Sequence, residues 1–267
     1  MNRRHFLSLL AVAPALTPGR QRMLPDAGIQ LYTLRGPASQ DLPGVLAALA
    51  DLGYTKVEFA GYHGHAPQEV KRILADVGLA APAAHATLGQ MREDIDALIE
   101  HAVAVGHHYL VCAWMSPDQR TSLDAWRGIC HEFNHFGEKC AAAGVQFAFH
   151  NHEFEFEELD GRMPYDLILE RTDAGLVKLE LDWYWTAYAG QDTIALMQAH
   201  PDRFRLFHVK DMATDRSMVD VGDGTLDFAA LIEAARGVGG QHFFVERDNA
   251  TEPLVTARRS IAHLRTL

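Results

Sequence analysis

Short apolar runs alternate with longer amphipathic stretches along this chain, and the pattern repeats about eight times from Gly28 onward. The apolar runs have the length of strands, and the stretches between them repeat apolar residues at helical spacing. We predict strands at residues 28–35, 55–60, 79–86, 108–114, 145–150, 176–182, 203–210 and 242–247. We predict helices at residues 41–52, 66–77, 91–105, 121–143, 163–173, 191–199, 226–237 and 252–265. Such alternation indicates parallel strands joined by right-handed crossovers, so the pattern predicts an α/β fold, a single closed (β/α)₈ TIM barrel.

Local signals at helix ends and the lack of linkers agree with this prediction. Asp41 precedes Pro43 at the start of the first predicted helix, as a capping residue ahead of a first-turn proline does. Gly53 and Gly78 follow the first two predicted helices, where glycine favours the left-handed conformation that ends a helix. No Pro-, Gly- or Ser-rich linker and no fixed-period repeat divides residues 27–267, which we therefore interpret as one domain.

The composition is that of an ordinary globular protein with an acidic balance. The 267 residues are 48% hydrophobic and 22% charged, which is enough apolar material for a large core. The formal net charge of −11 disfavours a nucleic-acid partner, because phosphate binding depends on clustered Lys and Arg. The three cysteines, Cys112, Cys130 and Cys140, show no C-x-x-C spacing. They therefore predict buried small residues and not a disulfide framework or a thiolate zinc site.

Residues 1–19 have the features of an export signal. The basic pair Arg3 and Arg4 precedes a short apolar run, and small residues of the A-x-A kind occur between Ala11 and Ala15. The segment resembles a bacterial twin-arginine signal peptide, and it is too short to span a membrane as a helix. We therefore expect a periplasmic protein, with a frayed amphipathic N-terminus as the alternative.

Four predicted strands end in side chains that can bind a metal. In the run VQFAFHNHEFEF, alternation places His150 and His152 on one face of the strand. Three later strands end in the same manner, at Asp182 in VKLELDWYW, His208 in FRLFHVKD and Glu246 in HFFVERD. This mixed set of nitrogen and oxygen donors at strand ends indicates a site for a divalent metal.

Five of these segments together resemble a known superfamily. The runs GIQLYTLR, HNHEFEF, LDWYW, FHVKD and FVERD, in this order and spacing, are similar to the sugar phosphate isomerase/epimerase superfamily with xylose isomerase-like barrels. The resemblance covers residues 27–267 and implies a (β/α)₈ barrel with one divalent metal at the C-terminal mouth, acting on a sugar or polyol. Members include isomerases, epimerases, dehydratases and proteins that act on 3-keto sugars, so the resemblance does not name the substrate.

The resemblance also implies a ligand set. The family ligands on strands six, seven and eight match Asp182, His208 and Glu246, whereas the strand-five glutamate of the ketose epimerases matches His150. This departure leaves Glu246 alone in the role that two metal-bound glutamates share as acid and base. It also makes the site less anionic, which favours Mn²⁺, Co²⁺, Fe²⁺ or Zn²⁺ over Mg²⁺. His152 points to the same face as His150, so either histidine could be the strand-five ligand.

Three side chains near this set are candidates for proton transfer or charge stabilisation. Glu155 follows the strand-five polar cluster and could replace the missing carboxylate, although it also fits a solvated acidic run. Lys210 lies two residues after His208, hence on the same strand face, where an ammonium could stabilise an enediolate oxygen. His152 and Glu246 could move the proton.

Positions at the ends of the other strands are candidates for substrate contact, because active sites of this fold lie at that face. For each of them the alternative is core or rim packing, and the set is Gln30, Tyr32, Glu58, His85, Trp114 and Trp185. The HGH tract at His63 and His65 lies in a predicted Gly-rich loop after strand two. The longest polar connection, residues 211–227, is predicted to lie over the barrel mouth, with a solvated turn as the alternative.

These features together predict a metal-dependent sugar isomerase or epimerase that abstracts a proton next to a carbonyl and forms an enediolate. Loss of a β-substituent from the same intermediate would make the enzyme a lyase or dehydratase acting on keto-sugars or 3-keto-glycosides. A non-catalytic sugar-binding barrel is the alternative from another class, and the acidic balance disfavours phosphodiester cleavage. The expected partner is a small sugar, with no nucleic acid and no membrane span, and a homo-oligomer is compatible with the sequence.

The export prediction can be tested on the arginine pair. A twin-arginine signal is read through this pair, so Arg3→Lys combined with Arg4→Lys should leave the protein in the cytoplasm of its host. Cell fractionation followed by immunoblotting measures this, with Arg20→Lys as the matched control. Unchanged export of the double variant would contradict the assignment.

Overall fold

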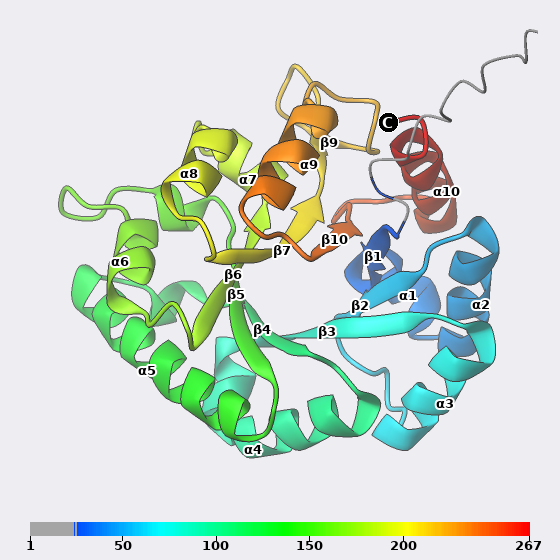
Figure 1. Ribbon diagram of the computed structural model, residues 1–267, viewed down its shortest axis with the longest axis horizontal. Helices are drawn as coiled ribbons and strands as arrows, with labels where there is room; N and C mark the ends of the chain where they lie inside the picture. The colour runs from blue at the N-terminus through cyan, green and yellow to red at the C-terminus, as the bar shows by residue number, and fades with distance from the viewer. Residues whose placement is uncertain (1–23, 25) are drawn as a thin grey trace, which may run out of the picture.

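The computed structural model describes Leu24 and residues 26–267, and its strands form a closed barrel with helices outside it (Figure 1). The predicted signal at residues 1–19 lies outside the described residues. The barrel strands are β1 (Gly28–Gln30), β2 (Lys56–Phe59), β3 (Ala80–Thr87), β4 (Tyr109–Trp114), β5 (Gln146–His150), β6 (Val177–Asp182), β7 (Phe204–Val209) and β10 (His242–Val245). Neighbours follow the chain order, each pair is parallel, and β10 closes on β1, which confirms the predicted TIM barrel.

Each predicted helix has a counterpart in the structure. The helices are α1 (Arg35–Ala38), α2 (Leu42–Leu52), α3 (Pro67–Val77), α4 (Leu88–Val105), α5 (Leu123–Ala142), α6 (Pro164–Arg171), α7 (Trp183–Tyr188), α8 (Thr193–Ala199), α9 (Phe228–Gly237) and α10 (Pro253–Leu264). The 3₁₀ turns are η1 (Leu31–Leu34), η2 (Pro117–Gln119) and η3 (Phe154–Phe156). The expected helix ends are confirmed, since Asp41 caps α2, and Gly53 and Gly78 adopt φ of 87° and 71°.

Two short elements differ from the prediction, and both lie where a strand meets the mouth. The first strand stops at Gln30, because its side chain accepts a hydrogen bond from the Tyr32 amide at 3.1 Å and starts η1. After β6 the chain turns at once into α7, whose first turn is capped by Asp182 through a 2.9 Å bond from the Trp185 amide. In both cases the last side chain of the strand accepts the first backbone hydrogen bond of the helical turn that follows.

The barrel interior is polar near the C-terminal ends of the strands, which we call the top, and apolar beneath them. A separate cluster of buried side chains fills its lower part, and it consists of Ala83, Tyr109, Val111, Ala148, Leu206 and Phe244. Because side chains two positions apart on a strand share a face, Ala148 and Leu206 stand directly below His150 and His208. The larger core lies between the strands and the helices, and it includes the three cysteines, which are buried and free as predicted. The polar side chains therefore rest on a water-excluding apolar base.

The long connection after β7 is ordered by one buried carboxylate. It contains the antiparallel pair β8 (Asp211–Met212) and β9 (Met218–Val219), and Asp211 accepts hydrogen bonds from the amides of Gly222 and Gly224 at 2.9 Å each. Asp220 from the same segment binds Thr256 of α10 at 2.8 Å. The segment thus packs against α10, and its Met218 Sδ accepts a 3.2 Å hydrogen bond from the amide of Asp248, although none of its residues lines the cavity described below.

Among the described residues, no helix combines the length and hydrophobicity that crossing a membrane requires.

Candidate functional site

Polar side chains on or directly after five strands, β3, β5, β6, β7 and β10, converge at the C-terminal mouth of the barrel, as the parallel strand order requires. We call one group the deep set, which consists of His85, His150, Glu180 and His208, and a second group the outer set, which consists of Asp182, His208 and Glu246. Within each set the potential ligand atoms lie within 4.8 Å of one another. The outer set corresponds to three of the ligands expected from the sequence.

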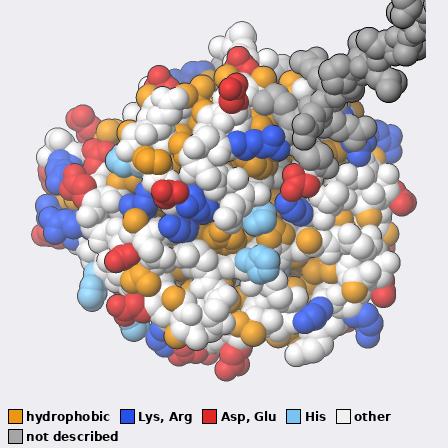
Figure 2. Space-filling view, viewed as in Figure 1, with side chains coloured by type: hydrophobic (Ala, Val, Ile, Leu, Met, Phe, Trp, Pro, Cys, Tyr) orange, Lys and Arg blue, Asp and Glu red, His pale blue; other side chains and the backbone are white. Residues whose placement is uncertain are grey.

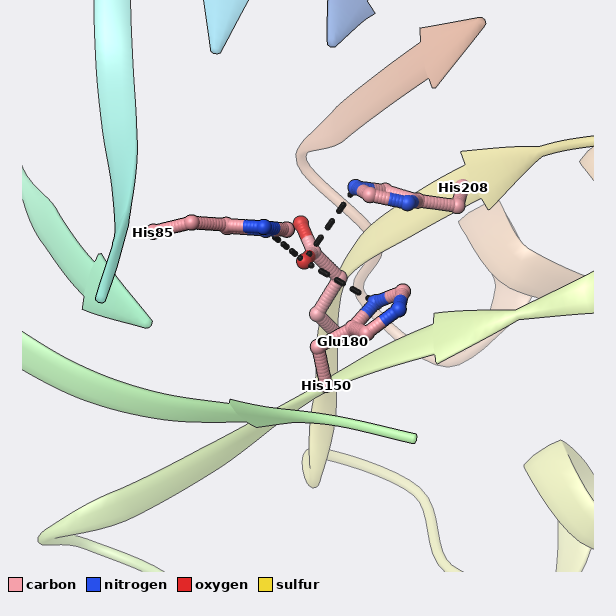
Figure 3. Close-up of side chains that lie close together, drawn as sticks. All are labelled: His85, His150, Glu180 and His208. Carbon is pink, nitrogen blue, oxygen red and sulfur yellow. Dashed lines mark hydrogen bonds and ion pairs between the residues drawn. The ribbon is translucent and has the colours of Figure 1, made fainter. Parts of the chain in front are cut away.

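The deep set is arranged around one carboxylate oxygen (Figure 3). Glu180 Oε2 lies 2.7 Å from His85 Nε2, 3.3 Å from His150 Nδ1 and 3.3 Å from His208 Nε2. Burial and the neighbouring Glu58 raise the pKa of Glu180 to about 7. Sequence reasoning missed Glu180, although its position two residues before Asp182 in VKLELD places both on one strand face.

Glu58 and Gln30 form a support beneath the deep set. Glu58 Oε2 accepts a 2.8 Å hydrogen bond from Gln30 Nε2 and lies 2.7 Å from His208 Nε2. Burial alone would raise the pKa of Glu58, but His85 and His208 lower it to about 2. Burial alone would also lower the pKa of His85, but Glu58 and Glu180 raise it to about 9. Both support residues are fully buried and outside the cavity lining, so the structure does not bring them to the predicted substrate position.

Lys210 lies among the carboxylates of the outer set. Its Nζ atom is 2.9 Å from Asp182, 2.8 Å from Glu246 and 3.0 Å from Asp248. Burial alone would lower the pKa of Lys210, but Asp182 and Glu246 raise it well above the usual range. The buried ammonium therefore carries its charge and offsets that of the surrounding carboxylates. Asp248 was not singled out from the sequence, although it follows Glu246 by two residues in FVERD.

The side chains of both sets are suited to a divalent cation. Imidazole nitrogens and carboxylate oxygens are ligands for Mn²⁺, Fe²⁺, Co²⁺ and Zn²⁺. Within the described part of the chain, the buried atoms His150 Nδ1, Glu58 Oε1 and Glu180 Oε1 have no hydrogen-bond partner. Such groups are costly to bury unless a ligand or water satisfies them. His150, expected beside Asp182, belongs to the deep set, and its Nε2 atom lies 3.9 Å from Asp182 Oδ2.

A cavity of about 470 Å³ opens above these side chains. Its floor includes His85, His150, His152, Lys210, Glu246 and Asp248, and its wall includes Tyr32, Trp114 and Gln90. Tyr32 and Trp114 are 42% and 44% exposed, so both aromatic rings are free to contact a ligand. Histidine side chains reach the surface near the centre of the face in Figure 2, with hydrophobic side chains around them. This volume and mixed lining are typical of a small-molecule site.

Three other predicted residues lie away from the cavity lining. Trp185 packs against the site, with its ring 5.6 Å from the His152 ring and 5.7 Å from Lys210 Nζ. Glu155 is fully buried in η3, where its Oε2 atom accepts a 2.8 Å hydrogen bond from the His152 amide. Glu155 is thus not part of a solvated acidic run, and it anchors the backbone of His152. His65 pairs with Glu69 at 3.2 Å, outside both sets.

The fold and the site define a barrel protein with a polar, cation-suited mouth, and comparison with known proteins identifies the family. Residues 46–267 match the xylose isomerase-like TIM barrel family, and the chain belongs to it. A crystal structure of a sugar phosphate isomerase/epimerase from Parabacteroides distasonis is similar with a TM-score of 0.81 and 25% identity, covering 90% of this chain and 97% of that one.

Two curated relatives extend the comparison. A 126-residue segment is 33% identical to an inosose dehydratase of Lactiplantibacillus plantarum, and it covers 40% of this chain and 41% of the dehydratase. Over 254 residues the chain is 24% identical to the rhizopine catabolism protein MocC of Rhizobium meliloti, covering 80% of this chain and 77% of that protein. The chain thus spans less than half the length of the dehydratase that it matches. The proteins similar to this chain thus include a sugar phosphate isomerase/epimerase and an inosose dehydratase.

The buried Glu155 predicts a pH-dependent stability. Burial raises the pKa of Glu155 to about 8 from an ordinary value of 4.5, so the folded protein holds a proton that the unfolded chain loses. This contribution to stability is present below the ordinary pKa and is lost as pH rises through 8. Glu155→Gln keeps an acceptor for the His152 amide and removes the titrating group. Between pH 5 and pH 8.5 its free energy of unfolding should therefore rise by roughly 2–5 kcal/mol relative to that of the wild type.

Denaturant unfolding with a metal chelator present measures this difference at both pH values. Glu157→Gln, at an exposed position next to η3, is the matched control and should follow the wild type. Parallel pH profiles for Glu155→Gln and wild type would show that Glu155 is ionised in the folded protein.

Proposed function

We propose that the protein is a metal-dependent sugar isomerase or epimerase that abstracts a proton next to a carbonyl through an enediolate. The observation that carries the proposal is the position of Glu246, which lines the cavity while its carboxylate contacts Lys210 at 2.8 Å and His208 at 2.7 Å. A carboxylate and an ammonium of the cavity floor thus meet the imidazole of His208, which belongs to both sets. Family membership supports enzymatic activity on a small carbohydrate-like molecule.

Glu246 is the proposed proton acceptor. Burial alone would raise the pKa of Glu246, but Lys210 and His208 hold it well below the usual range, so the carboxylate is ionised at neutral pH. Lys210 is positioned to donate a hydrogen bond to an oxygen that gains negative charge next to the abstracted proton. A divalent ion held by Asp182, His208, Glu246 and His150 would supply Lewis-acid polarisation of two neighbouring substrate oxygens.

His152 is the proposed partner for returning a proton. Burial and the nearby Lys210 lower the pKa of His152 to about 3, so the imidazole is neutral at physiological pH. A neutral imidazole has one N–H donor and one acceptor nitrogen, which suits a group that passes a proton on. Tyr32 and Trp114 are proposed to hold the apolar face of the substrate ring against the wall.

Elimination is the second candidate reaction, and the match to an inosose dehydratase favours it. Proton abstraction is the same in both reactions, and departure of a β-substituent from the intermediate would replace reprotonation. The proposed place of action is the periplasm, and this proposal depends on the arginine pair near the N-terminus alone.

Solvent exchange tests the proposed function before the physiological product is known. Proton abstraction precedes the choice between epimerisation and elimination, so the Mn²⁺ form should exchange a carbon-bound hydrogen of its substrate with D₂O. We would follow deuterium incorporation by NMR over a panel of ketoses and 3-keto-glycosides. Glu246→Gln should slow exchange by roughly 10²- to 10⁴-fold, because it removes the base and keeps the shape.

Glu233→Gln is the matched control, since Glu233 is exposed on α9 and belongs neither to the cavity lining nor to either set, and it should exchange like wild type. Exchange accompanied by loss of a substituent would assign the protein as a lyase. Binding of panel members without any exchange would contradict the enzyme proposal and favour a sugar-binding barrel.

A further inference from the structure

His150 and His208 face both sets. In each ring, one nitrogen lies near Glu180 of the deep set and the other lies near a carboxylate of the outer set. His150 has Nδ1 3.3 Å from Glu180 and Nε2 3.9 Å from Asp182. His208 has Nε2 3.3 Å from Glu180 and Nδ1 2.7 Å from Glu246. Both sets therefore need His208, and His150 of the deep set also faces Asp182 of the outer set.

A neutral imidazole has a lone pair on one ring nitrogen and a hydrogen on the other. His208 can thus ligate a metal with Nδ1 or with Nε2, but not with both at once. Either choice leaves an N–H that needs an acceptor, and both acceptors are present. Glu58 lies 2.7 Å from Nε2, and Glu246 lies 2.7 Å from Nδ1. A hydrogen bond to a carboxylate of this kind fixes the tautomer of a metal-ligating histidine.

The two positions offer different donors. The deep set supplies three imidazoles and one carboxylate, whereas the outer set supplies two carboxylates and the shared His208. Two of the three Glu180 distances in the deep set are 3.3 Å, and a tetrahedral zinc site with bonds of about 2.0–2.1 Å separates its ligand atoms by roughly this amount. Imidazole-rich sites suit Zn²⁺, and carboxylate-rich sites suit Mn²⁺.

The charge already present also separates the two positions. Lys210 Nζ lies 2.9 Å from Asp182 and 2.8 Å from Glu246, so an ion in the outer set must displace a buried ammonium. Asp248, at 3.0 Å and partly exposed, can retain the displaced Lys210 toward the cavity. An ion in the deep set leaves the pairs of Lys210 in place and displaces only protons of its own imidazoles. Two features therefore favour Zn²⁺ in the deep set. Its donors are mostly imidazoles, and binding there does not displace the Lys210 ammonium.

We propose that one divalent ion has two mutually exclusive positions in this mouth, the deep set for Zn²⁺ and the outer set for Mn²⁺, selected by which nitrogen of His208 and His150 binds it. The inference rests on the proposed function only in that the mouth binds a divalent ion. Zn²⁺ in the deep set holds His208, which the outer position also requires. Binding of one metal therefore excludes the other.

Metal affinities of the apo protein test the proposal without any substrate. Competition with a chromophoric chelator measures Zn²⁺, and the EPR signal of free Mn²⁺ measures Mn²⁺. His85→Gln should weaken Zn²⁺ by more than about tenfold and leave Mn²⁺ within about twofold, since removing even an outer partner of a ligand costs roughly 10- to 100-fold. Asp182→Asn should weaken Mn²⁺ binding and leave Zn²⁺ binding nearly unchanged. Glu180→Gln should have the same effect as His85→Gln.

The wild-type protein gives a second readout that does not depend on the folding of a variant. Adding Zn²⁺ to the Mn²⁺ form should release one Mn²⁺ for each Zn²⁺ bound. Two ions bound together, an apo protein that takes up neither ion, or variants that weaken both metals equally would each overturn the proposal. Hydrogen exchange is a separate measurement, so its failure would reject the proposed function and leave the metal positions standing.

Discussion

The ion pairs between buried carboxylates and buried cations at the barrel mouth are the constraint on which the rest of this structure depends. Glu58, Glu180, Asp182 and Glu246 are all buried, and each carboxylate would cost several kcal/mol if it were left without a partner. His85, His208 and Lys210 are the neighbouring groups whose positive charge offsets this cost. The same arrangement leaves the mouth able to accept a divalent ion, because an ion can replace the protons and the ammonium that now balance the carboxylates.

The barrel makes this concentration of charge possible. Parallel strands deliver their final residues to one rim, and the apolar cluster with Phe244 and Leu206 seals the space below it. Water is excluded from the underside, so the interactions above it are stronger than they would be at the surface. Gln30 and Glu58 add a polar layer between this seal and the ligands, and they orient His208 through a 2.7 Å contact. Such support holds the imidazole of His208 in one orientation.

Much of the fold could be predicted from the sequence, because the spacing of apolar residues and the signals that end helices are local properties of the chain. Eight strands and their helices follow from alternating apolar patterns, and caps such as Gly53 mark the ends. The side chains that end β5, β6 and β7 could also be located, since parallel strands bring them to one rim. The depth of each side chain within the barrel could not be predicted from the sequence, because it depends on the stagger between neighbouring strands. Glu180 and Glu58 therefore emerge as interior groups only in the structure.

The role of Glu155 illustrates a second limit. Four glutamates in six residues after β5 look like a solvated segment, and the fold of η3 alone turns one of them inward onto the His152 amide. A backbone contact of this kind leaves no periodic signal in the sequence. Lys210 is similar, because its position on the strand was predictable and its three carboxylate partners were not.

Metal content tests the central claim that this cluster is built to hold a divalent ion. The protein would be stripped of metal, reconstituted with Mn²⁺, Co²⁺ or Zn²⁺, dialysed and analysed for elements beside the variant His208→Ala. The account predicts one tightly held ion per chain in the wild type and none in the variant, because His208 belongs to both ligand sets. A wild-type protein that holds no ion after reconstitution would contradict the account.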